Sequence, residues 1–217
     1  MDRKSVMVIG LGRFGSALAK KLVEFEQRVI GVDKVRSRVE EMADVVDIAV
    51  QLDSTDPEAL IKAGVKECDV AVVTIGENIE ASVLTTSILR DLKIPRVIAR
   101  ANNVLHARVL ARVGAHRVIF PERDMGQRLA EIIVHPWISD FTALGGKFLI
   151  GELPAPKSLC GKTLAELNFS TTYNIIVLLV RRGESFVFPR GSTQLYEGDK
   201  LIVAGFPEDI KKFKEFS

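Results

Sequence analysis

A glycine-rich turn near the N-terminus constrains the fold of this 217-residue chain more than any other feature. A short apolar run over residues 6–9 leads into three glycines in the spacing G-x-G-x-x-G, namely Gly10, Gly12 and Gly15. An amphipathic segment follows over residues 14–25, and a second apolar run ends on Asp33. This order predicts a buried strand, a phosphate-binding turn, a helix and a second parallel strand.

The three glycines have different predicted roles. Gly10 permits the tight turn, Gly12 lets a phosphate approach the backbone, and Gly15 lets the helix pack on the sheet. The free N–H groups of the first helical turn, which begins at Arg13 and Phe14, then point at the anion. The Arg13 cation can reach the terminal phosphate of a bound nucleotide or of a nucleotide in a neighbouring subunit. The alternative for the glycine pattern is a tight turn that binds no ligand. The alternative for Arg13 is a solvent-exposed side chain without a role in binding.

Asp33 ends the second predicted strand, where its carboxylate can accept hydrogen bonds from both ribose hydroxyls of a nucleotide. A 2′-phosphate would meet a negative charge there, which disfavours NADP. A lone glycine pattern is weak evidence, but its place between a strand and a helix, ahead of this aspartate, makes it strong.

Strand-like and helical segments alternate through the first two-thirds of the chain. Further strands are predicted over residues 45–50, 70–74, 95–99 and 117–120, and further helices over 57–63, 77–89, 104–112 and 122–134. Such alternation predicts an α/β fold with a doubly wound parallel sheet of the Rossmann type. The helix over 104–112 is expected to end before Gly114.

The pattern changes near residue 135, which predicts a second, smaller domain. Strands are expected over residues 147–153, 175–181, 185–188 and 200–205, with short helices near Leu164 and over 208–215. We therefore predict a Rossmann domain over 1–135 with a crossover helix near 122–135, a linker over 136–146, and a small α+β domain over 147–217.

Ligands of open parallel sheets bind outside the carboxyl ends of the strands. Residues at the other strand ends are therefore candidate cofactor-binding positions: Lys34, Asp53, Ser54, Thr55, Thr74, Ile75, Gly76, Arg100 and Glu122. The alternative is ordinary loops and helix caps. Glu122 is unusual, because a carboxylate near phosphates is repulsive unless a divalent cation bridges them; otherwise it is an acid favoured at a helix N-terminus.

Composition excludes several classes of function. The net charge is only +2, which argues against nucleic-acid binding. Cys68 and Cys160 are expected to be free thiols in a reducing cytosol, and no apolar run is long enough to span a bilayer.

An NAD-dependent oxidoreductase is the alternative function, although none of the three histidines lies at a predicted strand end. A redox-sensing DNA-binding repressor would need a helix-turn-helix and a basic face, and neither is found.

Several motifs resemble those of the RCK (KTN) regulatory subunits of bacterial potassium-uptake systems, the KtrA/TrkA family. These are V-I-G-L-G-R-F-G at 8–15, D-S-T-D at 53–56, I-G-E-N-I-E-A-S at 75–82, L-T-T at 84–86, R-A-N-N at 100–103 and P-E-R-D-M at 121–125. The resemblance covers nearly the whole chain and implies an RCK_N (TrkA_N) domain followed by an RCK_C (TrkA_C) domain.

The resemblance implies a regulatory protein rather than an enzyme. Such subunits form octameric rings, built of dimers, under a membrane-embedded potassium-translocating subunit of the KtrB/TrkH kind, at the inner face of the membrane. ATP or ADP, or alternatively NAD(H) or AMP, binds the Rossmann cleft and changes the shape of the ring. Arg13 would then contact a phosphate across a subunit contact, and Glu122 would share a divalent cation, Mg or Ca, with its symmetry mate.

The C-terminal part resembles a module that binds cyclic di-AMP in some members of the family. This chain departs from the polar ligand-binding pattern of those members at Asn168, Ser170 and Ile176. We therefore expect this domain to dimerise without binding cyclic di-AMP. The apolar residues available for the interface are Leu159, Leu164, Ile175 and Pro189.

Overall fold

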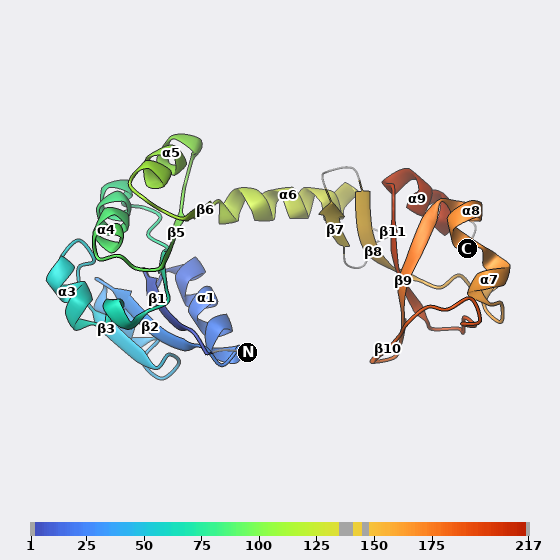
Figure 1. The fold of residues 1–217 in the computed structure, drawn as a ribbon, viewed down its shortest axis with the longest axis horizontal. Helices are drawn as coiled ribbons and strands as arrows, with labels where there is room; N and C mark the ends of the chain where they lie inside the picture. Colours follow the sequence, from blue (N-terminus) through green and yellow to red (C-terminus); the bar gives the residue numbers. More distant parts are fainter. Residues whose placement is uncertain (1–2, 135–140, 145–147, 216–217) are drawn as a thin grey trace. The chain divides into compact units, whose positions relative to one another are not determined.

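A computed structural model describes residues 3–134, 141–144 and 148–215. The chain separates into two compact units, Met1–Met125 and Gly126–Ser217 (Figure 1). The division falls inside helix α6 (Pro121–Val134). The domain boundaries expected from the sequence stay predictions, and most of the predicted linker lies outside the described residues.

The first unit is built on a six-stranded sheet whose strands all run parallel. The strands are β1 (Ser5–Ile9), β2 (Arg28–Asp33), β3 (Ile48–Gln51), β4 (Val70–Val73), β5 (Arg96–Arg100) and β6 (Arg117–Ile119). Their order in the sheet is β3-β2-β1-β4-β5-β6. This is the doubly wound arrangement of a Rossmann domain, and it confirms the predicted fold class.

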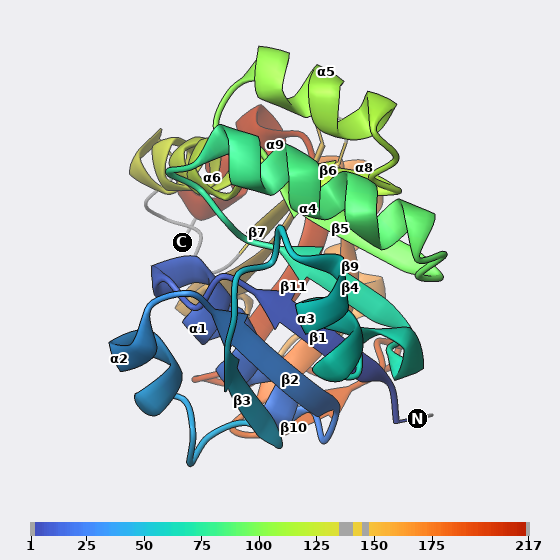
Figure 2. The ribbon, with the colours of Figure 1, turned by 90° about the vertical axis from the view of Figure 1, so that its left-hand side faces the viewer.

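Helices cover both faces of this sheet (Figure 2). They are α1 (Arg13–Glu24), α2 (Arg36–Glu40), α3 (Pro57–Lys62), α4 (Ile79–Asp91) and α5 (Val104–Arg112), with a 3₁₀ turn at Val65–Glu67. Because successive side chains of a strand point to opposite faces, Val6 and Val8 of β1 belong to the core cluster that includes residues of α1 and α2. Met7 and Ile9 belong to the cluster that includes residues of α3, α4 and α5.

The region before β3 differs from the prediction. Residues 45–47 precede the strand, and the short helix α2 was not predicted. Val46 is buried in the core without belonging to a strand, so its apolar character made the predicted strand too long at its start. The helix end at Gly114 is confirmed, because this residue has a φ of 108° and directly follows Val113, the C-cap of α5.

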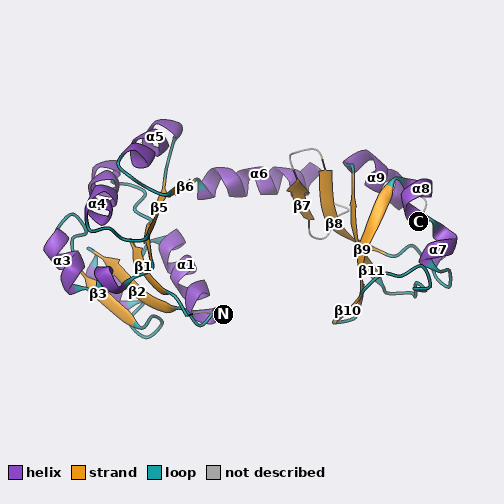
Figure 3. Cartoon of the chain, in the orientation of Figure 1, coloured by secondary structure: helices purple, strands orange, loops and turns teal. Residues whose placement is uncertain are grey.

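The second unit holds a five-stranded antiparallel sheet in the order β10-β9-β11-β8-β7 (Figure 3). Its elements are β7 (Phe141–Leu144), β8 (Phe148–Pro154), a 3₁₀ turn (Lys157–Leu159), α7 (Leu164–Leu167), α8 (Phe169–Tyr173), β9 (Ile175–Arg182), β10 (Ser185–Val187), β11 (Lys200–Gly205) and α9 (Pro207–Glu215). Leu153, Leu201 and Phe213 are among the buried residues of a separate core, which confirms the small α+β part.

Two expectations for the second unit are wrong. Residues 141–144, expected in a linker, form β7, which pairs with β8 from Phe141 opposite Gly151. Four residues carry too little local pattern to be recognised as a strand, although Gly145 and Gly146 directly after them are a turn signal. Leu159 and Ile175, expected at a dimer interface, lie in the core of the unit, because they face its own helices and strands.

Candidate functional site

Helix α1 begins without help from a capping side chain. Gly12 is its N-cap, with no side-chain hydrogen bond and no acidic residue in the first turn of this described segment. By contrast, α3, α4 and α5 are capped by Asp56, Asn78 and Asn103. The first-turn N–H groups of α1, with the helix dipole behind them, are therefore suited to bind an anion.

The geometry separates the three predicted glycines. Gly10 has a φ of 99°, as the tight turn requires. A Cβ on Gly15 would lie 1.9 Å from the carbonyl oxygen of Gly10, so Gly15 is needed where the helix packs on the turn. A Cβ on Gly12 would meet no described atom within 4 Å. Gly12 therefore faces open space, where a ligand can approach the backbone.

Thr74, directly after β4, contacts the glycine turn through its hydroxyl group. Its hydroxyl oxygen lies 2.5 Å from the carbonyl oxygen of Gly10 and 2.9 Å from that of Ile9. The residue is only 5% exposed. Because the Ile9 carbonyl also accepts the N–H of Thr74 at 2.8 Å, the single hydroxyl proton is available to the Gly10 carbonyl.

Asp33 is buried at the end of β2, where its carboxylate is tied to the turn. One oxygen accepts the N–H of Leu11 at 2.7 Å, and the other accepts the N–H of Val35 at 2.8 Å. The Arg38 guanidinium lies 3.4 Å from the same carboxylate. The oxygen that accepts from Val35 keeps a further lone pair, whereas the other oxygen accepts from both Leu11 and Arg38. The group therefore fixes the turn and can still accept a hydrogen bond from a ribose hydroxyl. Arg38 was not among the predicted binding residues. The available signal was a basic residue about one helical turn beyond Asp33.

These groups border a cavity of about 1240 Å³ at the carboxyl ends of the strands. Of the predicted binding residues, all except Gly15 line it: Gly10, Gly12, Arg13, Phe14, Asp33, Lys34, Asp53, Ser54, Thr55, Thr74, Ile75, Gly76, Arg100 and Glu122. Ser37, Arg38 and Glu41 line it too and were not predicted. The structure brings the predicted residues together, and their roles in binding stay predictions.

Beside Asp33, the cavity is bordered by the loop after β3. Asp53 accepts hydrogen bonds from the backbone and the side chain of Thr55 at 2.9 and 2.7 Å, and these bonds hold the pKa of its carboxyl below the usual value. Ser54 is buried, and its hydroxyl lies 2.8 Å from that of Thr85. This end of the cavity therefore combines anionic acceptors, which suit ribose hydroxyls, with the cations Lys34 and Arg38.

At the far end of the cavity, two predicted residues pair with each other. Arg100 donates to the Glu122 carboxylate at 2.5 Å. The Arg100 guanidinium also lies against Gly76, because a Cβ there would come within 2.9 Å of it. The Asn102 side chain donates to the Gly76 carbonyl. The close approach expected at Gly76 is therefore made, within this chain, by Arg100.

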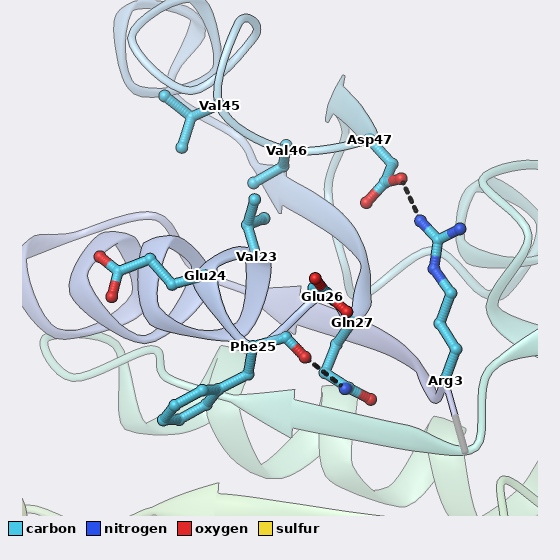
Figure 4. A pocket seen from close by; sticks show the side chains of 9 residues that line it. All are labelled: Arg3, Val23, Glu24, Phe25, Glu26, Gln27, Val45, Val46 and Asp47. Atoms are coloured by element: carbon cyan, nitrogen blue, oxygen red, sulfur yellow. Dashed lines mark hydrogen bonds and ion pairs between the residues drawn. The ribbon is translucent and has the colours of Figure 1, made fainter. Parts of the chain in front are cut away.

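A second hollow, of about 910 Å³, lies at the amino ends of β1, β2 and β3 (Figure 4). Arg3 pairs with Asp47 at 3.1 Å, and the other Asp47 oxygen accepts the N–H of Val29. The Gln27 amide accepts the N–H of Lys4 and donates to the Phe25 carbonyl. Because these polar groups already satisfy one another at the end opposite the glycine turn, we do not assign a ligand to this hollow.

The described residues give little support for metal or acid–base chemistry. No group of three or more His, Cys, Asp or Glu side chains in the described ranges could hold a metal ion. His106 is buried, and burial lowers the pKa of its imidazole; neither it nor His116 lines the cavity. Cys68 and Cys160 are free thiols. No helix within the described part of the chain is long and apolar enough to cross a membrane.

Comparison with known proteins gives matches along most of the chain. Family models for the TrkA-N domain and the TrkA-C domain match residues 6–121 and 152–217. Ktr system potassium uptake proteins C and A of Bacillus subtilis (strain 168) are 37% and 34% identical to it, over 98% and 99% of this chain and 97% of each relative. A solved structure of GsuK bound to ADP is 25% identical, with a TM-score of 0.52, and the match covers 61% of this chain and 34% of that longer one.

Proposed function

Because the chain belongs to the family of potassium-uptake proteins built from a TrkA-N and a TrkA-C domain, we propose that it is a regulatory subunit that senses an adenine nucleotide. It is a binding protein and not an enzyme. The observation that carries this proposal is the uncapped start of α1 at Gly12, which opens onto a cavity that Asp33 also borders. Together they offer a phosphate site and a ribose site in the spacing of a Rossmann nucleotide cleft.

ATP and ADP are the proposed ligands, ahead of NAD(H) and AMP. The GsuK structure, which matches 61% of this chain, is of the protein bound to ADP. Arg13 at the turn and Arg100 at the far end both line the cavity and favour ligands with several phosphate charges. The exposed Glu122 carboxylate at the start of α6 is the proposed ligand of a divalent cation, Mg or Ca. Since it is a single carboxylate, the nucleotide phosphates and a second copy of the chain would supply the remaining ligands.

The proposed partner is a membrane-embedded potassium-translocating subunit, and the chain is proposed to act on it from the cytoplasmic side as a ring of eight. Helix α6 supports self-association, because none of its residues is buried in the single chain. Its exposed apolar residues fall at helical spacing along one side: Met125, Leu129, Ile132 and Ile133. For the second unit we propose dimerisation without cyclic di-AMP.

Calorimetry of the purified full-length chain tests the proposal. We expect saturable binding of ATP and ADP, and light scattering should give a particle of eight subunits. Flux through vesicles that carry the membrane subunit should differ between ATP and ADP, because a ligand shifts a ring only if it binds the two shapes differently. Absence of binding to ATP, ADP, AMP and NAD(H), or steady consumption of NADH with a substrate, would refute it.

A further inference from the structure

The ion pair between Arg100 and Glu122 joins a mostly buried side chain to an exposed one. Arg100 ends β5, and its side chain is 20% exposed. Glu122 lies in the first turn of α6, and its side chain is 65% exposed. The arginine is therefore held by its surroundings, whereas the glutamate can turn out to solvent without losing buried contacts.

Arg100 has a donor that its present contacts leave unused. Its Nε is buried and has no hydrogen-bond partner among the described residues. One Nη group donates to Glu122, and the guanidinium rests against Gly76 on the side of the cavity. Because buried donors are normally paired, this guanidinium is under-used in the ligand-free chain. A phosphate oxygen is the acceptor that a guanidinium binds best, often through two parallel bonds.

The position of Arg100 relative to the glycine turn restricts which ligands can reach it. The turn follows β1, whereas Arg100 ends β5, and β4 lies between the two strands. Two interstrand spacings are about 10 Å. A single phosphate on the turn stays beside β1, whereas a chain of phosphates that extends along the cavity approaches β5. The cavity is continuous between these points, because it is lined by Gly12, Thr74, Gly76 and Arg100.

We propose that Arg100 determines specificity for the length of the phosphate chain, and that it exchanges Glu122 for the terminal phosphate of a nucleoside triphosphate. This inference rests on the proposed function, since it requires a nucleotide with its first phosphates on the turn. The exchange frees the Glu122 carboxylate at the first turn of α6. A diphosphate leaves the ion pair in place. Charge at the end of the ligand, rather than its size, is then what the far end of the cleft recognises.

The test is calorimetry of ATP and ADP binding in a chelator, so that no divalent cation bridges Glu122 to the ligand. Arg100→Gln should lower ATP affinity about tenfold, a loss of the size expected for a charge-assisted contact, and should change ADP affinity less than about twofold. Arg100→Lys should retain part of the preference for ATP. Glu122→Gln should raise ATP affinity about threefold, because it removes the competing partner, and this gain should vanish in the double variant.

Arg3→Gln is the matched control, because it breaks another Arg–carboxylate pair of the first unit at the opposite end of the sheet (Figure 4). It should leave both affinities unchanged, and circular dichroism should show the same fold for every variant. Equal losses for ATP and ADP in Arg100→Gln, or no gain in Glu122→Gln, would overturn the inference while leaving the proposed function intact. Failure of the unaltered chain to bind either nucleotide would overturn both.

Discussion

Replacing Gly12 with alanine tests whether the turn exists for a ligand or only for the fold. The backbone at Gly12 has φ −70° and ψ −174°, which alanine adopts without strain. No described atom lies within 4 Å of the Cβ position. Loss of glycine flexibility in the unfolded chain stabilises by about 0.4–1 kcal/mol. Alanine is a poorer N-cap than glycine by about 0.5–1 kcal/mol, so these effects roughly cancel. We therefore expect unfolding free energy to change by less than about 0.5 kcal/mol.

Nucleotide binding should respond very differently to Gly12→Ala. The added methyl group occupies the space through which a phosphate reaches the first-turn N–H groups of α1. Displacing the phosphate from even one charge-assisted hydrogen bond costs about 1.5–3 kcal/mol, which is a loss of affinity of at least about tenfold. Urea unfolding without ligand and calorimetry with ADP measure the two effects separately. Unchanged ADP affinity in a stably folded variant would refute the assignment of the turn.

Gly15→Ala is the informative contrast. Its Cβ would lie 1.9 Å from the Gly10 carbonyl oxygen and 2.7 Å from the Thr74 hydroxyl. The helix and the turn would have to separate by about 1 Å, so we expect a loss of about 3 kcal/mol or more in unfolding free energy, at the upper end of overpacking effects. A Gly15→Ala variant as stable as the unaltered chain would show that α1 packs less closely than described.

Three further changes probe other parts of the chain. Arg13→Ala should weaken ATP binding several-fold more than ADP binding in calorimetry, because its charge is proposed to face the outer phosphates; equal losses would contradict that role. Asp33→Asn should lower both nucleotide affinity and unfolding free energy, the latter by about 1–2 kcal/mol, since the N–H of Leu11 loses a charged acceptor. In the second unit, hydrogen bonds from Arg182 hold the pKa of the Asp199 carboxyl below its usual value. The stability from that pair should be present at neutral pH and lost as the pH falls below about 4, and Asp199→Asn should remove this acid-dependent part in urea titrations.

Local sequence patterns predicted the first unit well where they were anchored by residues with few structural alternatives. The glycine turn, the alternation of apolar runs with helices, and the helix end at Gly114 each have one straightforward physical solution. The six-stranded parallel sheet followed from that alternation. Patterns failed where apolar residues served a core without forming the expected element, as Val46 does before β3, and where β7 depended on pairing with β8.

The candidate site was predictable as a set of strand ends, but its internal contacts were not. The carboxyl ends of parallel strands meet at one edge of the sheet, so residues from Gly10 to Glu122 could be expected together. The bond from Leu11 to Asp33 and the pairing of Arg100 with Glu122 depend on side-chain positions set by tertiary packing. Sequence spacing says nothing about such partners, because the paired residues are far apart in the chain.

The central position of β1 has a consequence for how the chain folds during its synthesis. Within the first unit β1 is synthesised before the other strands, yet one of its two neighbours, β4, pairs with it only through Val70–Val73. At translation rates of about 5–20 residues per second, the stretch from Ile9 to Val73 takes roughly 3–13 s to synthesise, and β1 waits that long for its partner. During this interval an apolar strand remains open on one edge, which is a recognised cause of aggregation. We expect nascent chains that end before β4 to need chaperone protection, and chains that extend past Val73 to need it less.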